Sequence, residues 1–288
     1  MAQNLAAALF KNYTPLLDEA YKLASLTAKL DTADDLVRYT SGAHEVIVQK
    51  MTLQGLANYD RVNGYVAGEV SLANESIPFN YERGRMFVVD NMDNEETAGV
   101  AYGRLAGEFL RSYVVPEIDA VRFAAYAANK GNTADDAAIA EGGWYKKVSA
   151  AWRELTENEV PENDRHLFIT AAGYEDIMNM DTIKAKTFFD QCASVTIVPQ
   201  SRFYETVKLT ANGAGGYARE TGANNINFEL IHKPAVIQVL KHQDAKVIRP
   251  EDNQTADAWK FGYRVYGLND VYENKVKGIY VSTSDVTA

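Results

Sequence analysis

The sequence predicts an α+β fold organised around one long helix. Three observations lead to this prediction: a helical pattern over residues 93–129, two β-rich segments upstream of it, and an alternation of strands and helices downstream. Ordinary globular helices have about a third of this length. A helix this long is therefore expected to act as a spine for the rest of the chain.

Composition narrows the class of protein. The 288 residues are 47% hydrophobic and 24% charged, which is enough for one large or two modest cores. The net charge of -10 argues against binding of nucleic acid through its phosphates, because that requires surplus Lys and Arg. The single cysteine, Cys192, excludes an internal disulfide and fits a reducing compartment. We read no signal peptide and no apolar run of ~20 residues that would cross a membrane.

Residues 1–43 are predicted to form an N-terminal arm with one helix. Thr14 is a suitable helix cap and Pro15 suits the first helical position. The small apolar run at residues 4–10 has few partners nearby in the sequence, so we expect it to pack on another surface.

Residues 44–90 are predicted to form an extended β-hairpin. Segments 44–53 and 77–89 are rich in β-branched and aromatic residues, and Asn63-Gly64 between them is a strong turn signal. An isolated hairpin is marginally stable in water, so one that projects this far is expected to contact another subunit; folding back onto its own domain is the alternative. The intersubunit tip is predicted at Tyr59, Asp60, Arg61, Val62, Asn63, Gly64, Tyr65 and Val66.

The spine helix is predicted to start at a cap formed by Asp93 or Asn94. Apolar residues then recur at spacings of three and four, first as Ala98, Tyr102, Leu105, Phe109 and Tyr113, then as Val114, Ile118, Val121, Ala125 and Ala128. Pro116 lies inside this pattern. Proline removes an N–H and clashes with the preceding turn, so we expect a kink or break there. Pro116 is the predicted spine hinge.

The region after the spine is predicted to be an α/β domain. A polar stretch at residues 132–141 marks a domain boundary, and Trp144, Val148, Trp152 and Leu155 form one helical face. Further strands are predicted at 167–170, 194–198, 226–231, 235–240, 261–266 and 278–281, with a helix at 171–180. A glycine- and asparagine-rich loop spans 210–225, and its predicted intersubunit residues are Asn212, Gly213, Gly215, Gly216, Tyr217 and Arg219.

The sequence predicts no catalytic residue, no cofactor site and no metal site. The four histidines are scattered, and neither His-Glu-x-x-His nor Cys-x-x-Cys occurs. The glycines at 213–216 lack the Gly-Lys-Ser/Thr ending of a phosphate-binding loop. The acidic run from Asp90 to Glu96 lacks the ligand alternation of a calcium loop, and Cys192 has no activating base near it in the sequence.

Several segments, taken in order, resemble those of one family. They are YERGRMFVVDNMDNEET (81–97) and VVPEIDAVRF (114–123), followed by patches at 160–170, 198–203, 226–236, 249–259, 263–266 and 274–281. Together they cover nearly the whole chain and resemble the major capsid proteins of tailed bacteriophages. No patch is diagnostic alone; their order and the matching architecture carry the resemblance.

The resemblance implies the Hong Kong 97-type coat fold. In that fold residues 1–43 would be the N-terminal arm, 44–90 the extended loop, 91–131 and 246–288 the peripheral domain, and 132–245 the axial domain. It also implies a structural protein rather than an enzyme. Its subunits would form pentamers and hexamers that close an icosahedral shell around double-stranded DNA, and the loop of one subunit would lie over its neighbour.

The implied partners are other copies of the chain, a portal and decoration proteins. The implied location is the virion capsid, after synthesis in the cytoplasm of a bacterial host. Some relatives carry a long N-terminal scaffolding segment, and nothing resembling it precedes Met1; we therefore expect a separate scaffolding protein or a chain given in mature form. Some relatives also cross-link a loop lysine, but Lys50 lies at the base of the predicted hairpin, so we do not assign that chemistry.

Three alternatives stay open at this point. The chain would also suit an encapsulin-like compartment shell of the same fold, which loads an enzyme rather than DNA. A hydrolase with acidic catalytic residues is disfavoured because the sequence shows no compact catalytic constellation. A small tail or adhesion module is disfavoured by the spine and by the extent of the resemblance.

Overall fold

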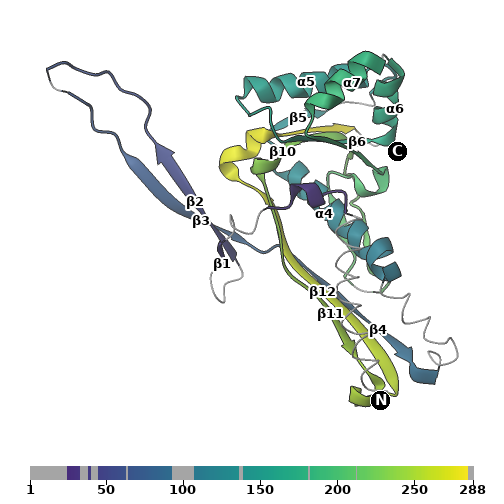
Figure 1. Cartoon of the computed structure of the whole chain (residues 1–288). Helices are drawn as coiled ribbons and strands as arrows, with labels where there is room; N and C mark the ends of the chain where they lie inside the picture. Colours follow the sequence, from purple (N-terminus) through teal and green to yellow (C-terminus); the bar gives the residue numbers. More distant parts are fainter. Residues whose placement is uncertain are drawn as a thin grey trace.

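The computed structural model describes residues 25–32, 38–39, 45–62, 64–92, 107–135, 139–180, 182–211 and 213–284. Several predicted features lie outside these residues: the helix beginning near Thr14, the helix cap at Asp93 or Asn94, and the contact residues Asn63 and Asn212. Within the described chain, Figure 1 shows a projecting hairpin, a long three-stranded sheet beside the spine helix, and a five-stranded sheet under three helices.

The projecting hairpin consists of β2 (Glu45–Leu53) and β3 (Val70–Pro78), with the short β1 (Arg38–Tyr39) at its base. β2 and β3 pair antiparallel from Glu45↔Pro78 to Leu53↔Val70. The prediction of a hairpin is confirmed, but its second strand is residues 70–78 and not 77–89. Residues 77–89 have a continuous strand-like pattern, so nothing in the sequence indicated that the chain passes from one sheet to another within them.

The chain changes sheets at residues 79–80. β4 (Tyr81–Asp90) pairs antiparallel with β12 (Ala258–Val271), which in turn pairs with β11 (Val236–Ile248). Asn80 fixes the crossing, because its Nδ2 donates to the carbonyl of Asn269 at 2.8 Å and its Oδ1 accepts from the Asn269 N–H at 3.1 Å. This contact joins residues far apart in sequence, so local patterns could not reveal it.

The spine is helical from residue 107 to Ala128. It contains a π-helical turn, η3 (Leu110–Val114), followed directly by α4 (Val115–Ala128). Of the predicted kink or break at Pro116, the break is wrong: the proline lies in the first turn of α4 and the helix continues through it. The kink stays a prediction. The Val115 N–H donates to the carbonyl of Leu110, and this wider turn relieves the clash that proline causes in a regular helix.

The π turn also changes which side chains the spine buries. Tyr113 was predicted on the apolar face but is 60% exposed, since one extra residue in a turn rotates the stripe about the axis. Ile118 is buried as predicted. The spine also buries three charged residues that the pattern did not reveal: Glu117, Asp119 and Arg122.

The five-stranded sheet has the order β5-β13-β10-β6-β7. Its strands are β5 (Asn132–Asp135), β13 (Ile279–Ser284), β10 (Asn225–His232), β6 (Arg165–Thr170) and β7 (Ser194–Val198). α5 (Trp144–Glu157), α6 (Ala171–Met180) and α7 (Thr182–Gln191) lie on one side of it and α4 on the other (Figure 1). The predictions of α5, α6, β6, β7 and β10 are confirmed.

Two predicted domain boundaries do not match the sheets. The boundary between residues 245 and 246 falls inside β11, and β13 belongs to the five-stranded sheet although it was assigned with the spine. The boundary stretch 132–141 begins with β5, which pairs parallel to β13.

α7 was not predicted. The remaining short elements are η1 (Ala28–Leu30), η4 (Gln200–Arg202), β8 (Val207–Leu209), β9 (Tyr217–Arg219), η5 (Lys233–Ala235), η6 (Pro250–Asp252) and η7 (Glu273–Gly278).

The main core lies between α4 and the five-stranded sheet. Phe123 of α4 packs edge-on against Phe168 of β6 and Phe203, with ring centroids 5.2 and 4.9 Å apart. A second cluster, containing Trp144, Val148 and Leu167, lies on the side of the sheet that α5 covers. A third cluster holds the three-stranded sheet to the spine. None of the described helices is long and apolar enough to cross a membrane.

Candidate functional site

The hairpin tip is a wide loop closed by one bridge. The N–H of Gly64 donates to the carbonyl of Asp60 at 2.7 Å, and the Asp60 N–H donates to the Gly64 carbonyl at 3.2 Å. Gly64 has a φ of +82°, a backbone conformation that favours glycine, so the predicted turn is confirmed there. The rings of Tyr59 and Tyr65 pack edge to face, 4.9 Å apart, on either side of the bridge.

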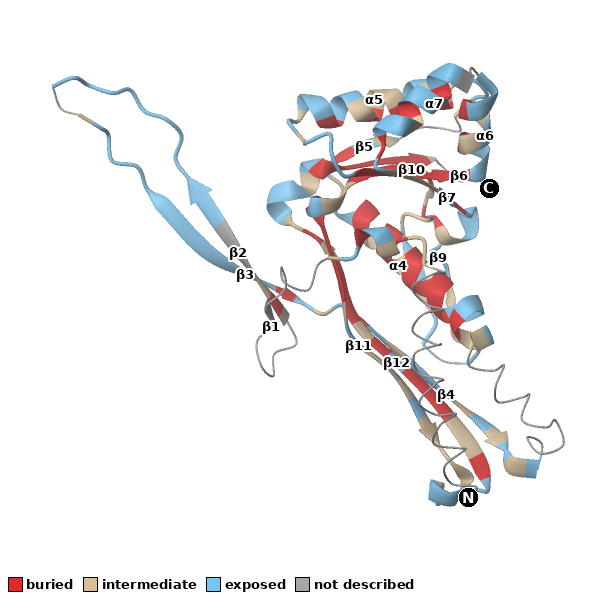
Figure 2. Cartoon of the chain, viewed as in Figure 1, coloured by how far each residue is buried: buried red, intermediate tan, exposed pale blue. Residues whose placement is uncertain are grey.

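The hairpin exposes apolar side chains along much of its length (Figure 2). At the predicted tip, Val62 is 91% and Tyr65 90% exposed. The other large exposed apolar side chains of the hairpin are Met51, Leu53, Leu56, Tyr59, Val66, Val70 and Leu72. Contiguous exposed apolar surface of this kind marks an interaction site in soluble proteins.

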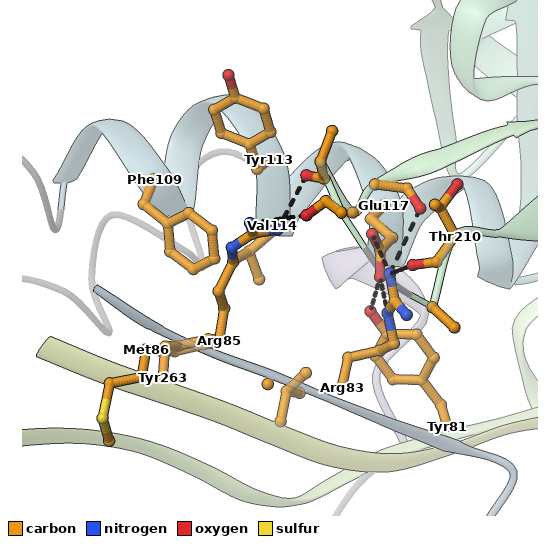
Figure 3. A pocket seen from close by; sticks show the side chains of 17 residues that line it. Tyr81, Arg83, Arg85, Met86, Phe109, Tyr113, Val114, Glu117, Thr210 and Tyr263 are labelled. Atoms are coloured by element: carbon orange, nitrogen blue, oxygen red, sulfur yellow. Dashed lines mark hydrogen bonds and ion pairs between the residues drawn. The ribbon is translucent and has the colours of Figure 1, made fainter. Parts of the chain in front are cut away.

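The glycine-rich loop between β8 and β9 lies beside the spine and β4 of the same chain. Arg85 donates to the carbonyls of Gly213 and Ala214, each at 2.9 Å, and Arg83 donates to the carbonyl of Thr210 at 3.0 Å (Figure 3). These residues, with Phe109, Tyr113 and Tyr263, line a cavity of about 420 Å³.

The predicted loop-contact residues occupy different places. Gly213, Gly215 and Gly216 have φ values of +67°, +70° and +82°, which explains the glycines at this tip. Tyr217 donates its hydroxyl to the carbonyl of Ser201 at 3.1 Å, and Arg219 lies in β9 opposite Val207. The contacts of this loop in the described chain are internal, so its intersubunit role stays a prediction.

Glu117 ties the spine to β4. Its Oε1 accepts from Arg83 Nε at 2.7 Å and from the Tyr81 hydroxyl at 3.1 Å. The hydrogen bonds that Arg83 donates to Glu117 raise the pKa of Arg83, more than burial lowers it. Figure 3 shows Arg83 between Glu117 and the loop carbonyls, so one guanidinium joins three parts of the chain.

Asp119 anchors residues 25–27 to the spine. This fully buried carboxylate accepts from the hydroxyls of Ser25 and Thr27, each at 2.8 Å, and from the Leu26 N–H at 3.1 Å. Arg122, one turn further along, donates to Thr27 Oγ1 at 2.9 Å. The signal for this site was present in the sequence, since the charges of residues 117, 119 and 122 interrupt an otherwise apolar helix.

Glu229 is a fully buried carboxyl group in the middle of the five-stranded sheet. Its neighbours across the strands are Phe168 and Val281, both members of the core under α4. Burial raises its pKa well above the usual value, and the charge of Lys130 opposes this in part. Lys130 itself forms an ion pair with Glu205. Burial therefore favours the neutral form of the Glu229 carboxyl group.

The described residues do not assemble a metal site. No group of three or more His, Cys, Asp or Glu side chains that could hold a metal occurs among them. Burial raises the pKa of Cys192 to about 12, so its thiol is protonated at neutral pH and is a poor nucleophile. Burial lowers the pKa of His166, whose Nδ1 lies 2.7 Å from Ser194 Oγ on the paired strand β7.

Comparison with known proteins shows similarity in fold. No family model matches the sequence, and no curated protein matches it. A capsid structure of the cyanophage P-SCSP1u matches with a TM-score of 0.60 and 13% identity, over 88% of this chain and 86% of that one. A structure from Mycobacterium phage Che8 matches with a TM-score of 0.56 and 16% identity, over 82% and 84%.

A virus-like particle from Pyrococcus furiosus matches with a TM-score of 0.56 and 13% identity, over 92% of this chain and 95% of that one. At such identities the likeness concerns the fold. It extends over nearly the full length of each chain, and the predicted architecture is thereby confirmed.

Proposed function

We propose that this chain, which has the Hong Kong 97-type fold, is the major capsid protein of a tailed phage. Its copies form pentamers and hexamers that close an icosahedral shell around double-stranded DNA. The observation that carries the proposal is the projecting hairpin, whose exposed apolar tip needs a partner surface. Its role is structural and not catalytic.

The contact made by the hairpin is expected to join copies head to tail. The tip is one surface and its receptor on the neighbour is another, so each copy uses both. Such heterologous contacts generate closed rings when the rotation between copies closes, and rings of five and six are what an icosahedral shell requires. In each copy the ion pair of Arg83 and Glu117 joins β4 to the spine helix.

The net charge of -10 agrees with a container for packaged DNA. A negative inner wall repels phosphates and leaves the DNA free to be packed and released. Strong binding of free DNA to empty shells at physiological salt would count against this part of the proposal. The further partners we propose are a scaffolding protein, a portal and decoration proteins, and the location is the virion, after assembly in the bacterial cytoplasm.

An encapsulin-like compartment shell is the second candidate. The match to a virus-like particle from Pyrococcus furiosus over 92% of this chain is to a shell that is not described as a phage capsid, so we keep this candidate. The discriminating experiment is nuclease treatment of particles purified from the natural source, followed by extraction of nucleic acid. Protected double-stranded DNA of uniform length supports a phage capsid, whereas particles that hold a protein cargo and no DNA support the second candidate.

A further inference from the structure

The cavity beside the glycine-rich loop, here called the loop cavity, lies between three parts of the chain. Its walls come from the strands β4 and β12, the π turn of the spine and the loop between β8 and β9. Its volume of about 420 Å³ falls within the range of roughly 300–1,000 Å³ that is typical of small-ligand sites. π-helical turns within α-helices also occur often at functional sites. The shell proposal gives this cavity no role.

Arg85 gives the loop cavity a positive charge that no carboxylate of the described chain pairs. The other guanidinium in its lining, that of Arg83, forms an ion pair with Glu117 at 2.7 Å, so these two charges cancel. Arg85 instead donates to the carbonyls of Gly213 and Ala214, each at 2.9 Å. These bonds use two of the five N–H donors of a guanidinium, and the other donors are left for an incoming anion.

The glycine-rich loop holds the Arg85 guanidinium in place before a ligand arrives. A Cβ at residue 215 would lie 2.7 Å from Arg85 Nη1, so any residue other than glycine there would displace the guanidinium. Gly215 also has a φ of +70°, a conformation that favours glycine. A side chain that is already fixed by two hydrogen bonds loses less conformational entropy on binding. Arg85 is therefore preorganised for an anion.

Aromatic side chains form the wall of the loop cavity next to Arg85. Phe109 and Tyr113 lie one turn apart on the spine with their ring centroids 6.1 Å apart, and Figure 3 shows both rings beside the head of Arg85. Phe109 is supported from behind by Phe87, whose ring it meets edge to face at 4.8 Å. Tyr113 lines the cavity and is 60% exposed, so a ligand ring can stack on it.

We propose that the loop cavity binds a small monocarboxylate whose body is an aromatic ring. The guanidinium of Arg85 matches the two oxygens of a carboxylate through paired N–H···O bonds, and the rings of Phe109 and Tyr113 contact the apolar body. One unpaired cation in the lining suits one negative charge, since the second charge of a phosphate monoester would find no further unpaired cation among the described residues. The inference is independent of the proposed function.

Saturation-transfer NMR on the purified full chain tests the site with 3-phenylpropionate as the probe. Arg85→Met should weaken its binding about tenfold or more, because a charge-assisted hydrogen-bond pair is lost. Tyr113→Ala should weaken it about threefold, the effect of one lost ring contact. Arg264→Met is the matched control: it removes an arginine outside the cavity, paired with Glu82, and should leave binding as in the wild type.

A second pair of probes works on the wild-type chain and needs no variant. The neutral 3-phenylpropanamide has the same ring without the charge, so it should bind about tenfold more weakly than the acid. Acetylalanylphenylalanine carries the same ring and carboxylate at the end of a peptide. If it binds more tightly than 3-phenylpropionate, the ligand is the end of a protein chain; the reverse order assigns the site to a free aromatic acid.

Three results would overturn the inference. The first is that neither acid binds the wild-type chain at millimolar concentrations. The second is that the acid and the neutral amide bind equally well. The third is that Arg85→Met binds 3-phenylpropionate as tightly as the wild type or as the Arg264→Met control. Because the measurement reports binding by the chain itself, none of these results depends on whether the chain forms a shell.

Discussion

Arg83 and Glu117 form a partly buried ion pair at 2.7 Å, and it joins β4 to the spine helix. The side chains are 24% and 10% exposed. Tyr81 and the loop carbonyls complete the hydrogen bonding around the pair. The same guanidinium thus fixes the strand, the helix and the glycine-rich loop relative to one another.

Removal of Arg83 is expected to destabilise the subunit. Arg83→Met leaves the Glu117 carboxylate buried with the Tyr81 hydroxyl as its remaining hydrogen-bond donor among the described residues. We expect a loss of about 2 kcal/mol, less than for a fully buried pair because water still reaches Arg83. The measurement is urea unfolding of the unassembled subunit. Arg264→Met is the matched control, since its pair with Glu82 is exposed on both sides (61% and 53%) and should contribute less than ~1 kcal/mol. Equal losses in the two variants would contradict the role given to Glu117.

Asp119 is expected to hold residues 25–32 against the spine. Asp119→Ala removes the acceptor for Ser25, Leu26 and Thr27, so the amide protons of this segment should exchange at least tenfold faster with solvent. The measurement is hydrogen exchange followed by mass spectrometry. Ser25→Ala removes one of the donors and should cause a smaller change. Unchanged protection in Asp119→Ala would show that apolar contacts of Leu30 are sufficient to hold the segment.

Glu229 should make stability fall as pH rises. Its pKa in the folded chain lies above the usual value of a glutamate, so its stabilising effect is complete below the unfolded pKa of ~4.3 and is lost progressively as the pH rises from there to the folded pKa. Glu229→Gln cannot ionise. Its free energy of unfolding should therefore exceed that of wild type at pH 8, and the difference should shrink towards pH 4. Parallel stability curves for the two proteins between pH 4 and pH 8 would refute the assignment.

Pro116 remains a candidate hinge, although the helix continues through it after a π turn. The π turn from Leu110 to Val114 makes room for the proline, so Pro116→Ala should restore an N–H and allow a regular helix there. We expect a stability change within ~1 kcal/mol but altered curvature of assembled particles. Superposition of independent subunits within one shell is the direct check: identical spines in strongly different environments would remove Pro116 as the hinge.

The hairpin tip should be dispensable for folding and required for assembly. Replacing residues 55–68 with Asn-Gly keeps the β2–β3 ladder, which begins at Leu53↔Val70, and supplies a tight turn. The shortened chain should keep the circular dichroism and melting temperature of the wild-type subunit yet fail to form particles on a sizing column. Shells of normal size from the shortened chain would show that the tip is not an assembly contact.

The sequence predicts those elements whose signal is local. α6 and β7 match the predicted ranges residue for residue, because an apolar period and flanking breakers suffice to define them. The division between β3 and β4 was missed because Ile77 to Val89 is continuously strand-like, and the contact that separates the two strands, Asn80 with Asn269, is long-range.

In the candidate site, too, only the features with a local sequence signal could be predicted. The turn at Gly64 could be predicted, whereas the contacts of Arg83 could not, because they join β4 to the spine and to the glycine-rich loop. Asp119 and Arg122 were overlooked since a helical pattern assigns charges to solvent, and here partners from other segments satisfy them in the core.

Electron microscopy of the purified full chain is the decisive measurement for the proposed shell. We expect rings of five or six copies, or closed shells built from them, with density for the hairpin of each copy over its neighbour. A chain that stays monomeric at every concentration, or that forms symmetric dimers with the hairpins free, would contradict it.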